Sequence, residues 1–191
     1  MDIEKSVEAK ELKMRIQSFT PEWQEKTEDC IRDIIRTQRN DSTAEAKPRY
    51  KDIAKNCQRV PEEDFKIAID ENTGMVTGTI GLRFLRNGVG QLIRFGVRPA
   101  FEGKGIGSQL FNDLMDFAKT NQYKKIYLTT EADDGHAKAR GVYERRDFTR
   151  TNLGDMPKED LDLILAGDDN IKHIEEGKTL IYKLQLEQKG N

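Results

Sequence analysis

The sequence feature that most constrains this chain is a glycine-dense turn, GKGIGS at residues 103–108, between a strand-like run and a helix-like run. The first N–H groups of a helix have no intrahelical acceptor, and the helix dipole places partial positive charge at the same end. Glycine carries no Cβ, so a phosphate can approach such a backbone closely. The turn therefore predicts a phosphate site made of main-chain donors, with Lys104 as a nearby cation. The competing interpretation is a glycine-rich helix start that binds nothing.

Two common phosphate-binding motifs do not fit this turn. A P-loop needs G-x-x-x-x-G-K-[ST], but Gly105 follows Lys104, and Arg98 stands where the first glycine is required. The dinucleotide fingerprint G-x-G-x-x-G fails because its last position falls on Ser108 or on Leu110. The sequence therefore predicts neither a P-loop nor a Rossmann dinucleotide site.

Hydrophobic periodicity outlines the elements around the turn. Alternating apolar residues predict strands at 13–19, 65–70, 75–86, 89–97, 125–130, 148–151 and 179–186. Helical spacing predicts helices at 20–38, 50–57, 105–121 and 136–146. Asn87-Gly88 is a strong hairpin signal, so the centre of the chain is predicted to be an antiparallel meander. The run from strand 89–97 through helix 105–121 to strand 125–130 predicts one crossover unit.

Composition restricts the class of protein. A length of 191 residues with 36% hydrophobic content predicts one domain over residues 1–191, with residues 1–12 as a flexible lead-in. The 32 basic and 34 acidic side chains nearly cancel, which argues against nucleic-acid binding and against a disordered chain. No apolar stretch approaches the ~18 residues of a membrane span, and the N-terminus lacks a secretory signal. We therefore expect a cytoplasmic protein with no nucleic-acid or membrane partner.

Cysteine and histidine patterns point to no metal. Cys30 and Cys57 are too few for a disulfide framework or a four-ligand zinc site, and we interpret them as reduced thiols. His136 and His173 lie far apart and match no metal-binding spacing. The sequence therefore predicts no metal cofactor.

The stretch LIRFGVRPAFEGKGIGSQLF, residues 92–111, resembles the cofactor-binding motif of the GNAT superfamily of N-acetyltransferases. That motif reads as a strand, x-V-x-P, [Q/R]-x-x-G-x-[G/A] and an apolar helix. Val97, Pro99, Gly105 and Gly107 match it. The flanks fit as well: MVTGTIGL lies before the motif, and ARGVYERRDF after it is similar to the family's A-x-x-x-Y-E-x-x-G-F. The resemblance covers residues 65–150 and is weak outside them.

The resemblance implies an α+β fold: a mixed, mostly antiparallel sheet with a splayed central parallel pair and helices on both faces. It also implies acetyl-CoA as co-substrate. The pantetheine would pair with the backbone of Phe95, Gly96 and Val97. The pyrophosphate would sit on amides of the turn, and the implied contacts are Gly103, Lys104, Gly105, Ile106, Gly107 and Ser108.

The implied activity is transfer of an acetyl group to a primary amine by direct attack in a ternary complex. The N–H of Val97 would polarise the thioester carbonyl, and Tyr143 would contact the sulfur and stabilise the leaving thiolate. The alternative for Tyr143 is a core-facing aromatic at helical spacing. No general base is identified. Three acids follow strand 125–130 and are within reach of an amine through water: Glu131, Asp133 and Asp134.

Four positions depart from the family pattern. Glu102 stands where glutamine or arginine is preferred, and we expect it to turn to solvent. His136 replaces an asparagine that often contacts the cofactor, and is either a cofactor contact or a surface residue. Asp147 replaces a glycine, and Gln91 stands where some members carry a glutamate base. These departures keep open a second hypothesis, a non-catalytic module that binds CoA or a protein partner.

The acceptor is the least constrained part of the prediction. The family layout places it between loop 39–50 and the segment after residue 151. Residues 152–177 form an acidic insertion before the last strand, with eight acidic residues against two lysines, which would attract cationic amines. The alternative is a solvated insertion docked through leucines. A small-molecule amine, a protein lysine or N-terminus, O- or S-acyl transfer, and a homodimer all remain open.

Overall fold

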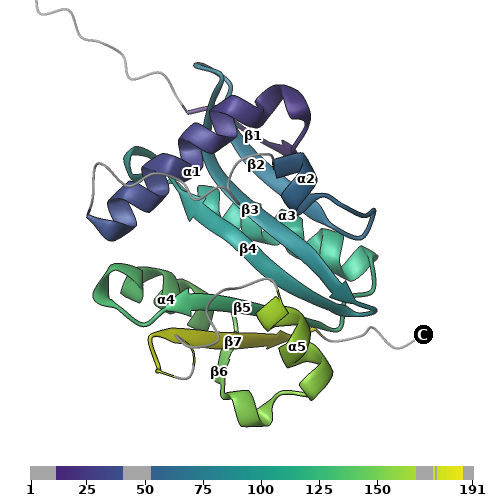
Figure 1. Ribbon diagram of the computed structural model, residues 1–191. Helices are drawn as coiled ribbons and strands as arrows, with labels where there is room; N and C mark the ends of the chain where they lie inside the picture. The colour runs from purple at the N-terminus through teal and green to yellow at the C-terminus, as the bar shows by residue number, and fades with distance from the viewer. Residues whose placement is uncertain (1–11, 41–52, 167–173, 175, 187–191) are drawn as a thin grey trace, which may run out of the picture.

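Seven strands form one sheet in the order β1-β2-β3-β4-β5-β7-β6 (Figure 1). The computed structural model describes residues 12–40, 53–166, 174 and 176–186. The predicted lead-in 1–12 lies outside these residues except for Leu12, which packs against the core. Most of loop 39–50 also lies outside them.

The strand boundaries follow the alternation of apolar residues closely. The strands are β1 Met14–Ser18, β2 Asp64–Asp70, β3 Met75–Arg86, β4 Val89–Val97, β5 Lys125–Glu131, β6 Thr149–Thr151 and β7 Thr179–Gln185. All neighbouring pairs are antiparallel except β4 and β5, which are parallel. The predicted fold class, a mixed and mostly antiparallel sheet with a central parallel pair, is confirmed.

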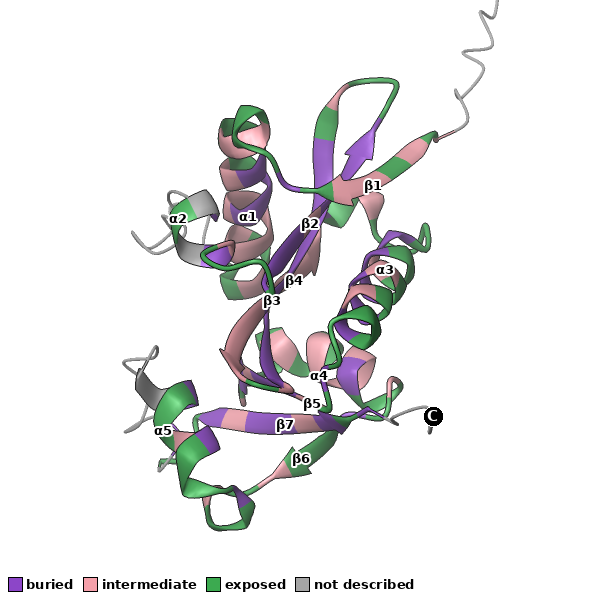
Figure 2. Ribbon diagram, turned by 90° about the vertical axis from the view of Figure 1, so that its right-hand side faces the viewer, coloured by how far each residue is buried: buried purple, intermediate pink, exposed green. Residues whose placement is uncertain are grey.

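Helices cover both faces of the sheet, as Figure 2 shows with the sheet nearly edge-on. They are α1 Gln24–Arg39, α2 Ile53–Cys57, α3 Ile106–Thr120, α4 Ala137–Glu144 and α5 Lys158–Ala166. One apolar cluster joins the sheet to α3 and to Tyr143 of α4. A second joins it to α1 and α2, and a third lies under α5. In Figure 2, α1, α2 and α5 lie on one side of the sheet and α3 on the other.

Helix α5 was not predicted as a helix. Residues 152–177 were interpreted as an acidic insertion, yet Lys158–Ala166 is helical. Ile164 is buried and Leu161 packs against the cluster under α5, whereas Leu163 is exposed. Two inward residues on a short, acid-rich helix give too weak a period to be read from sequence.

The parallel pair parts soon after it begins. Hydrogen-bonded pairing joins only Val89–Gln91 of β4 to Lys125–Tyr127 of β5. Within the described sheet, the rest of β4 has no partner on the β5 side, and Figure 1 shows the two strands diverging from this shared end. The pairing confirms the predicted splay.

A β-bulge lies in the part of β4 that pairs with β3 but not with β5. The register with β3 shifts between Thr79 and Gly81, and Arg94 adopts a left-handed backbone with φ 52°. The Thr79 hydroxyl donates to the Arg94 carbonyl at 2.7 Å, which satisfies an acceptor that the regular ladder would leave unpaired. Because a bulge bends its strand, it turns the end of β4 away from β5.

Helix α1 is held against the end of β4 by Arg98. The Arg98 guanidinium donates to the Val76 carbonyl at 2.8 Å and pairs with Asp29 at 2.6 Å and with Asp33. Gly96 permits the close approach, because a Cβ there would lie 2.8 Å from Ile34.

No helix in the described part of the chain is long and apolar enough to cross a membrane.

Candidate active site

A cavity of about 610 Å³ lies between the separated end of β4, the start of α3, and α4. Its walls include most of the residues predicted to contact a cofactor: Phe95, Gly96, Val97, Gly103, Gly105, Ile106, Gly107, Ser108 and Tyr143. Lys104 and His136 are not among its lining residues. The Lys104 ammonium lies 4.9 Å from the centre of the Phe101 ring.

The glycine turn has the backbone geometry of an anion-binding loop. Gly103 and Gly105 have φ of 76° and 78°, in the left-handed region that favours glycine, and Gly105 is the N-cap of α3. A Cβ built on either residue would have no heavy atom within 4 Å. These glycines are therefore required by backbone conformation, and the space above them is open to a ligand. The first N–H groups of α3 point toward this end of the helix.

Three cations line the cavity near the turn: Lys138, Arg145 and Arg146. Arg146 donates to the Ser108 hydroxyl at 2.9 Å, so it is positioned beside the start of α3. Burial and the neighbouring Arg145 lower the pKa of Arg146, which marks a site where an anion would be stabilising. These cations were not predicted as site residues, although Arg145-Arg146 lies within the run ARGVYERRDF that resembles the family pattern.

Glu102 does not leave a bare negative charge at the cavity. It lines the wall and forms an ion pair with Lys138. Both side chains are exposed, so the pair is at the rim and the two charges largely cancel. The repulsion that an unpaired carboxylate at this position would exert on a phosphate is reduced accordingly.

Tyr143 stands on the cavity wall within an aromatic cluster. Its ring lies 6.2 Å from Phe95, 6.0 Å from Phe148 and 6.4 Å from Tyr182, between ring centres. Burial raises the pKa of Tyr143 to about 12. No hydrogen-bond partner of its hydroxyl occurs among the described residues. The phenol is therefore neutral near pH 7 and able to donate a hydrogen bond into the cavity.

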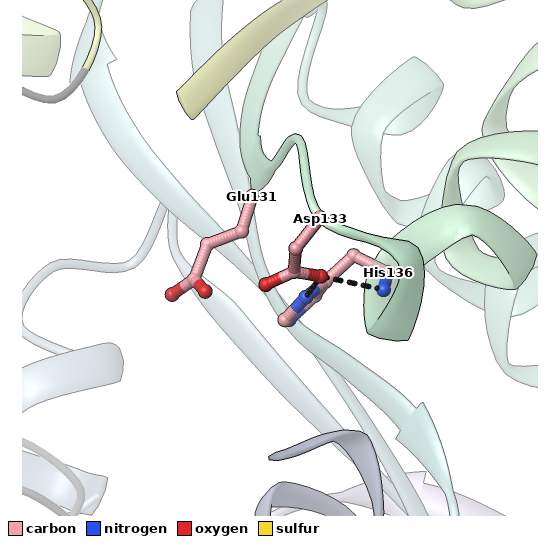
Figure 3. Close-up of side chains that lie close together, drawn as sticks. All are labelled: Glu131, Asp133 and His136. Atoms are coloured by element: carbon pink, nitrogen blue, oxygen red, sulfur yellow. Dashed lines mark hydrogen bonds and ion pairs between the residues drawn. The ribbon is translucent and has the colours of Figure 1, made fainter. Parts of the chain in front are cut away.

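Glu131, Asp133 and His136 lie together where β5 ends (Figure 3). One carboxylate oxygen each of Glu131 and Asp133 and one ring nitrogen of His136 all lie within 4.8 Å of one another. Asp133 Oδ1 contacts His136 Nδ1 at 2.7 Å and accepts from the His136 backbone N–H at 3.0 Å. The contact with His136 holds the pKa of Asp133 below its usual value. Arg140 fixes the loop by donating to the carbonyls of Glu131 and Asp133 at 2.8 and 2.7 Å.

A sequence model described as the acetyltransferase (GNAT) family matches residues 16–148, well over half of the chain. This chain belongs to the GNAT acetyltransferase family. The match includes every strand from β2 to β5 together with α3 and α4.

Solved structures share the fold of this GNAT protein over nearly its whole length. A GNAT-family acetyltransferase from Staphylococcus aureus Mu50 is 22% identical with a TM-score of 0.73, covering 92% of this chain and 100% of that chain. An acetyltransferase from Streptococcus agalactiae 2603 is 19% identical with a TM-score of 0.67, covering 91% and 98%. The PaiA N-acetyltransferase from Thermoplasma acidophilum, solved with coenzyme A, is 14% identical with a TM-score of 0.62, covering 92% and 100%.

Two departures from the GNAT sequence pattern have a visible structural setting. Asp147 has φ of 63°, a left-handed conformation that explains why the family prefers glycine there. Gln91 is buried on β4 and accepts from Arg83 Nη1 at 3.3 Å. A neutral amide does not accept a proton near neutrality, so Gln91 is not a general base.

Proposed function

We propose that this GNAT protein transfers an acetyl group from acetyl-CoA to a primary amine by direct attack in a ternary complex. The observation that carries the proposal is one cavity that joins the glycine turn of α3 to the separated end of β4, with Tyr143 on its wall. A structural neighbour from Thermoplasma acidophilum was solved with coenzyme A, which supports the choice of donor.

The residues of the cavity fit the parts of acetyl-CoA. The backbone of residues 103–108 and the cations Arg145 and Arg146 suit a diphosphate. The backbone of Phe95–Val97, which has no β5 partner in the described sheet, suits the amide groups of a pantetheine arm. Acetyl-CoA supplies the activated acyl group and a thiolate leaving group.

Tyr143 acts in this proposal as a neutral hydrogen-bond donor to the leaving sulfur. Its pKa, raised to about 12 by burial, makes full proton transfer to a thiolate unfavourable, since a thiol has a reference pKa of about 8.5. Donation without transfer still stabilises the developing negative charge. The ring contacts with Phe95 and Phe148 fix where the hydroxyl points.

His136 accepts the amine proton in this proposal, and Asp133 positions it. The new N–C bond forms as the C–S bond breaks, and the amine must lose one proton. With Asp133 ionised and bound to Nδ1, a neutral His136 presents the lone pair of Nε2. His136 follows Gly135, which lines the cavity, although His136 itself is not among the lining residues.

The decisive experiment combines cofactor binding with turnover. Acetyl-CoA and CoA should raise the melting temperature, and a broad amine panel should release free thiol from acetyl-CoA. His136→Gln should lower kcat while the CoA-induced shift in melting temperature stays the same. No shift at millimolar CoA would reject the proposal. A shift without thiol release from any amine would identify the non-catalytic CoA-binding module, which Gln91 favours, and product analysis separates N- from O- or S-acyl transfer.

We also propose a cytoplasmic location. It is supported by two free, buried cysteines, Cys30 and Cys57, since unpaired thiols are typical of reducing compartments.

A further inference from the structure

A second polar cluster lies at the closed end of the splay, away from the cofactor cavity. In the strand register, Arg83 of β3 lies opposite Gln91 of β4, and Gln91 lies opposite Tyr127 of β5. Gln91 and Tyr127 are the last paired residues of β4 and β5. Arg83 therefore stands next to the point where the two strands begin to separate.

Arg83 faces the side of the sheet opposite α3. Successive side chains of a strand alternate between faces, so residues 81, 83 and 85 share one face. A Cβ at Gly81 would touch Phe65 and Ile93, which belong to the apolar cluster of α1 and α2. Leu85 packs in the cluster under α5. Arg83 thus lies between the α1–α2 side and the α5 side of the same face.

Positive charge is in excess around Arg83. The charged neighbours that act on it include Arg59, Arg94 and Glu63. Glu63 is committed to Arg59: its Oε1 accepts from Arg59 Nη2 at 2.7 Å, and its Oε2 from the Arg59 backbone N–H at 2.7 Å. Glu63 Oε1 also accepts from the Phe84 backbone N–H at 3.1 Å. The single described carboxylate in this group of charges is therefore already saturated.

Arg83 itself has only a neutral partner in the described part of the chain. Its Nη1 donates to the Gln91 side-chain oxygen at 3.3 Å. Its Nε is buried and has no hydrogen-bond partner. Burial is the main cause that lowers the pKa of Arg83, and the neighbouring Arg59 adds to it. A partly buried guanidinium without a carboxylate is destabilising, and an unsatisfied buried donor in a folded protein calls for an explanation, of which a bound anion is one.

We propose that the amine acceptor carries a carboxylate, and that Arg83 binds it. This inference rests on the proposed acyltransferase function. With Nη1 used by Gln91 and Nε enclosed by the protein, Nη2 of Arg83 is the donor left for a ligand. Its N–H groups can make charge-assisted hydrogen bonds to a carboxylate.

The opposite end of the splay suits the amine. Tyr127 belongs to the cluster under α5, so Glu131, four residues later on β5, faces the same side as Arg83. Glu131 and Asp133 place negative charge there (Figure 3). A zwitterionic acceptor would have its ammonium near these acids and its carboxylate at Arg83. The acceptor is therefore an amino carboxylate rather than the polycation that the acidic segment 152–177 suggests.

The test uses acceptors that differ only at the end distal to the amine. The pairs are 4-aminobutanoate with 4-aminobutanamide and 6-aminohexanoate with 6-aminohexanamide, and 1,4-diaminobutane represents cationic acceptors. Thiol release from acetyl-CoA gives kcat/KM for each. We expect the better carboxylate to exceed its amide at least tenfold. Arg83→Gln should lower the carboxylate value at least tenfold, mainly through KM, and leave the amide value within twofold.

Arg15→Gln is the matched control, because Arg15 is exposed on β1 and makes only a loose contact with Glu71 at 3.7 Å. Arg15→Gln should leave kcat/KM unchanged for every acceptor. The melting temperature of Arg83→Gln should equal or exceed that of the wild type, since an arginine with a purely structural role would lower it when removed. If Arg83→Gln does not fold, Arg83→Met, which keeps the apolar stem, replaces it.

Two outcomes would overturn the inference while leaving the acyltransferase proposal intact. One is a wild-type enzyme that acetylates the amides or the diamine as well as the carboxylates. The other is an Arg83 variant that lowers kcat/KM for all acceptors by the same factor. If no amine is acetylated, the acyltransferase proposal fails, and binding decides the inference. A melting shift with 6-aminohexanoate in the wild type but not in Arg83→Gln supports the carboxylate site, and no shift in either rejects it.

Discussion

The Tyr143 hydroxyl is the single atom on which the proposed chemistry most depends. Tyr143→Phe removes only that oxygen and keeps the ring packed against Phe95 and Phe148. We expect kcat to fall at least tenfold, on the order of 1.4 kcal/mol of transition-state stabilisation. CoA should still raise the melting temperature. Because the pKa of Tyr143 is raised to about 12, the wild-type rate should show no loss from its ionisation up to about pH 10.

Tyr182→Phe is the matched control for this prediction. Its ring also contacts Tyr143, but its hydroxyl donates to Glu144 at 2.9 Å rather than facing the cavity. Its turnover should remain within about threefold of the wild type. Equal rates for Tyr143→Phe and the wild type would remove Tyr143 from the mechanism.

The cysteine thiols are expected to be inert in the folded protein. Cys30 and Cys57 are both fully buried, and burial raises the pKa of Cys30 to about 12. The thiolate is the reactive form of cysteine, and almost none of Cys30 is thiolate at pH 8. A thiol reagent should therefore modify the two cysteines of the chain only slowly under native conditions and rapidly in denaturant. Rapid native modification of Cys30 would show that its side chain is reached by solvent.

At the level of elements, the start of α3 separates two roles of glycine. Gly105 has φ of 78°, so Gly105→Ala should destabilise the fold by about 1–2 kcal/mol through backbone strain alone. Gly107 has an ordinary helical backbone, and a Cβ there would meet Phe95 at an unstrained 3.5 Å. Gly107→Ala should leave stability unchanged or raise it by about 0.5–1 kcal/mol. Urea unfolding of the two variants measures the difference, and equal stabilities would contradict the assigned strain.

The strands were predictable where local signals agree. Asn87-Gly88 fixes the hairpin, and alternating residues on either side fix β3 and β4 to the residue. The bulge at Arg94 was not predictable, because nothing in the sequence marks an arginine for a left-handed backbone. The contact between Asp133 and His136 was not predicted either. The two residues lie at the N-cap and the end of a single 3₁₀ turn, and so short an element has no hydrophobic period in the sequence.

At the scale of the whole molecule, the proposed reaction would bring its two substrates to different points along β4. The cavity lies at the separated end of β4, beside α3 and α4, whereas Arg83 lies at the closed end, on the face opposite α3. The bulge at Arg94 lies between the two along β4. In the proposed reaction the acyl group and the amine would meet in the gap between the two strands. The glycine turn is visible as a motif because its glycines lie close together in the sequence, whereas Arg83 and the residues around it come from separate strands and loops and form no motif.

Charge counted along the sequence does not show which acids face the solvent, for the same reason. The eight acids of residues 152–177 suggested an acidic rim, but Asp160 is fully buried and serves the fold. It accepts from Arg86 at 2.6 Å, from Lys125 at 3.1 Å and from the Tyr127 hydroxyl at 2.9 Å. A count of acidic residues along the sequence cannot distinguish an acid that faces solvent from one whose carboxylate accepts three hydrogen bonds inside the protein.

This Asp160 cluster ties α5 to β3 and β5, and gives a prediction with a definite pH dependence. Burial alone would raise the pKa of Asp160, but hydrogen bonds from Arg86, Lys125 and Tyr127 outweigh it and hold the pKa below its usual value. A carboxyl with a depressed folded-state pKa stabilises the fold above its unfolded pKa of about 3.9 and loses that effect as pH falls through the folded pKa.

Asp160→Asn should therefore lower the free energy of unfolding at pH 7 by about 1–3 kcal/mol, less than for a fully buried pair because Arg86 is partly exposed. The gap between wild type and variant should shrink as pH falls below about 4, because the carboxyl takes up its proton first in the unfolded chain and only at lower pH in the folded protein. Urea unfolding at pH 7 and near pH 3 measures both values. Asp162→Asn on the exposed side of α5 is the control and should differ from the wild type by no more than about 0.5 kcal/mol. A gap that stays the same at both pH values would show that Asp160 stabilises α5 by packing rather than by its charge.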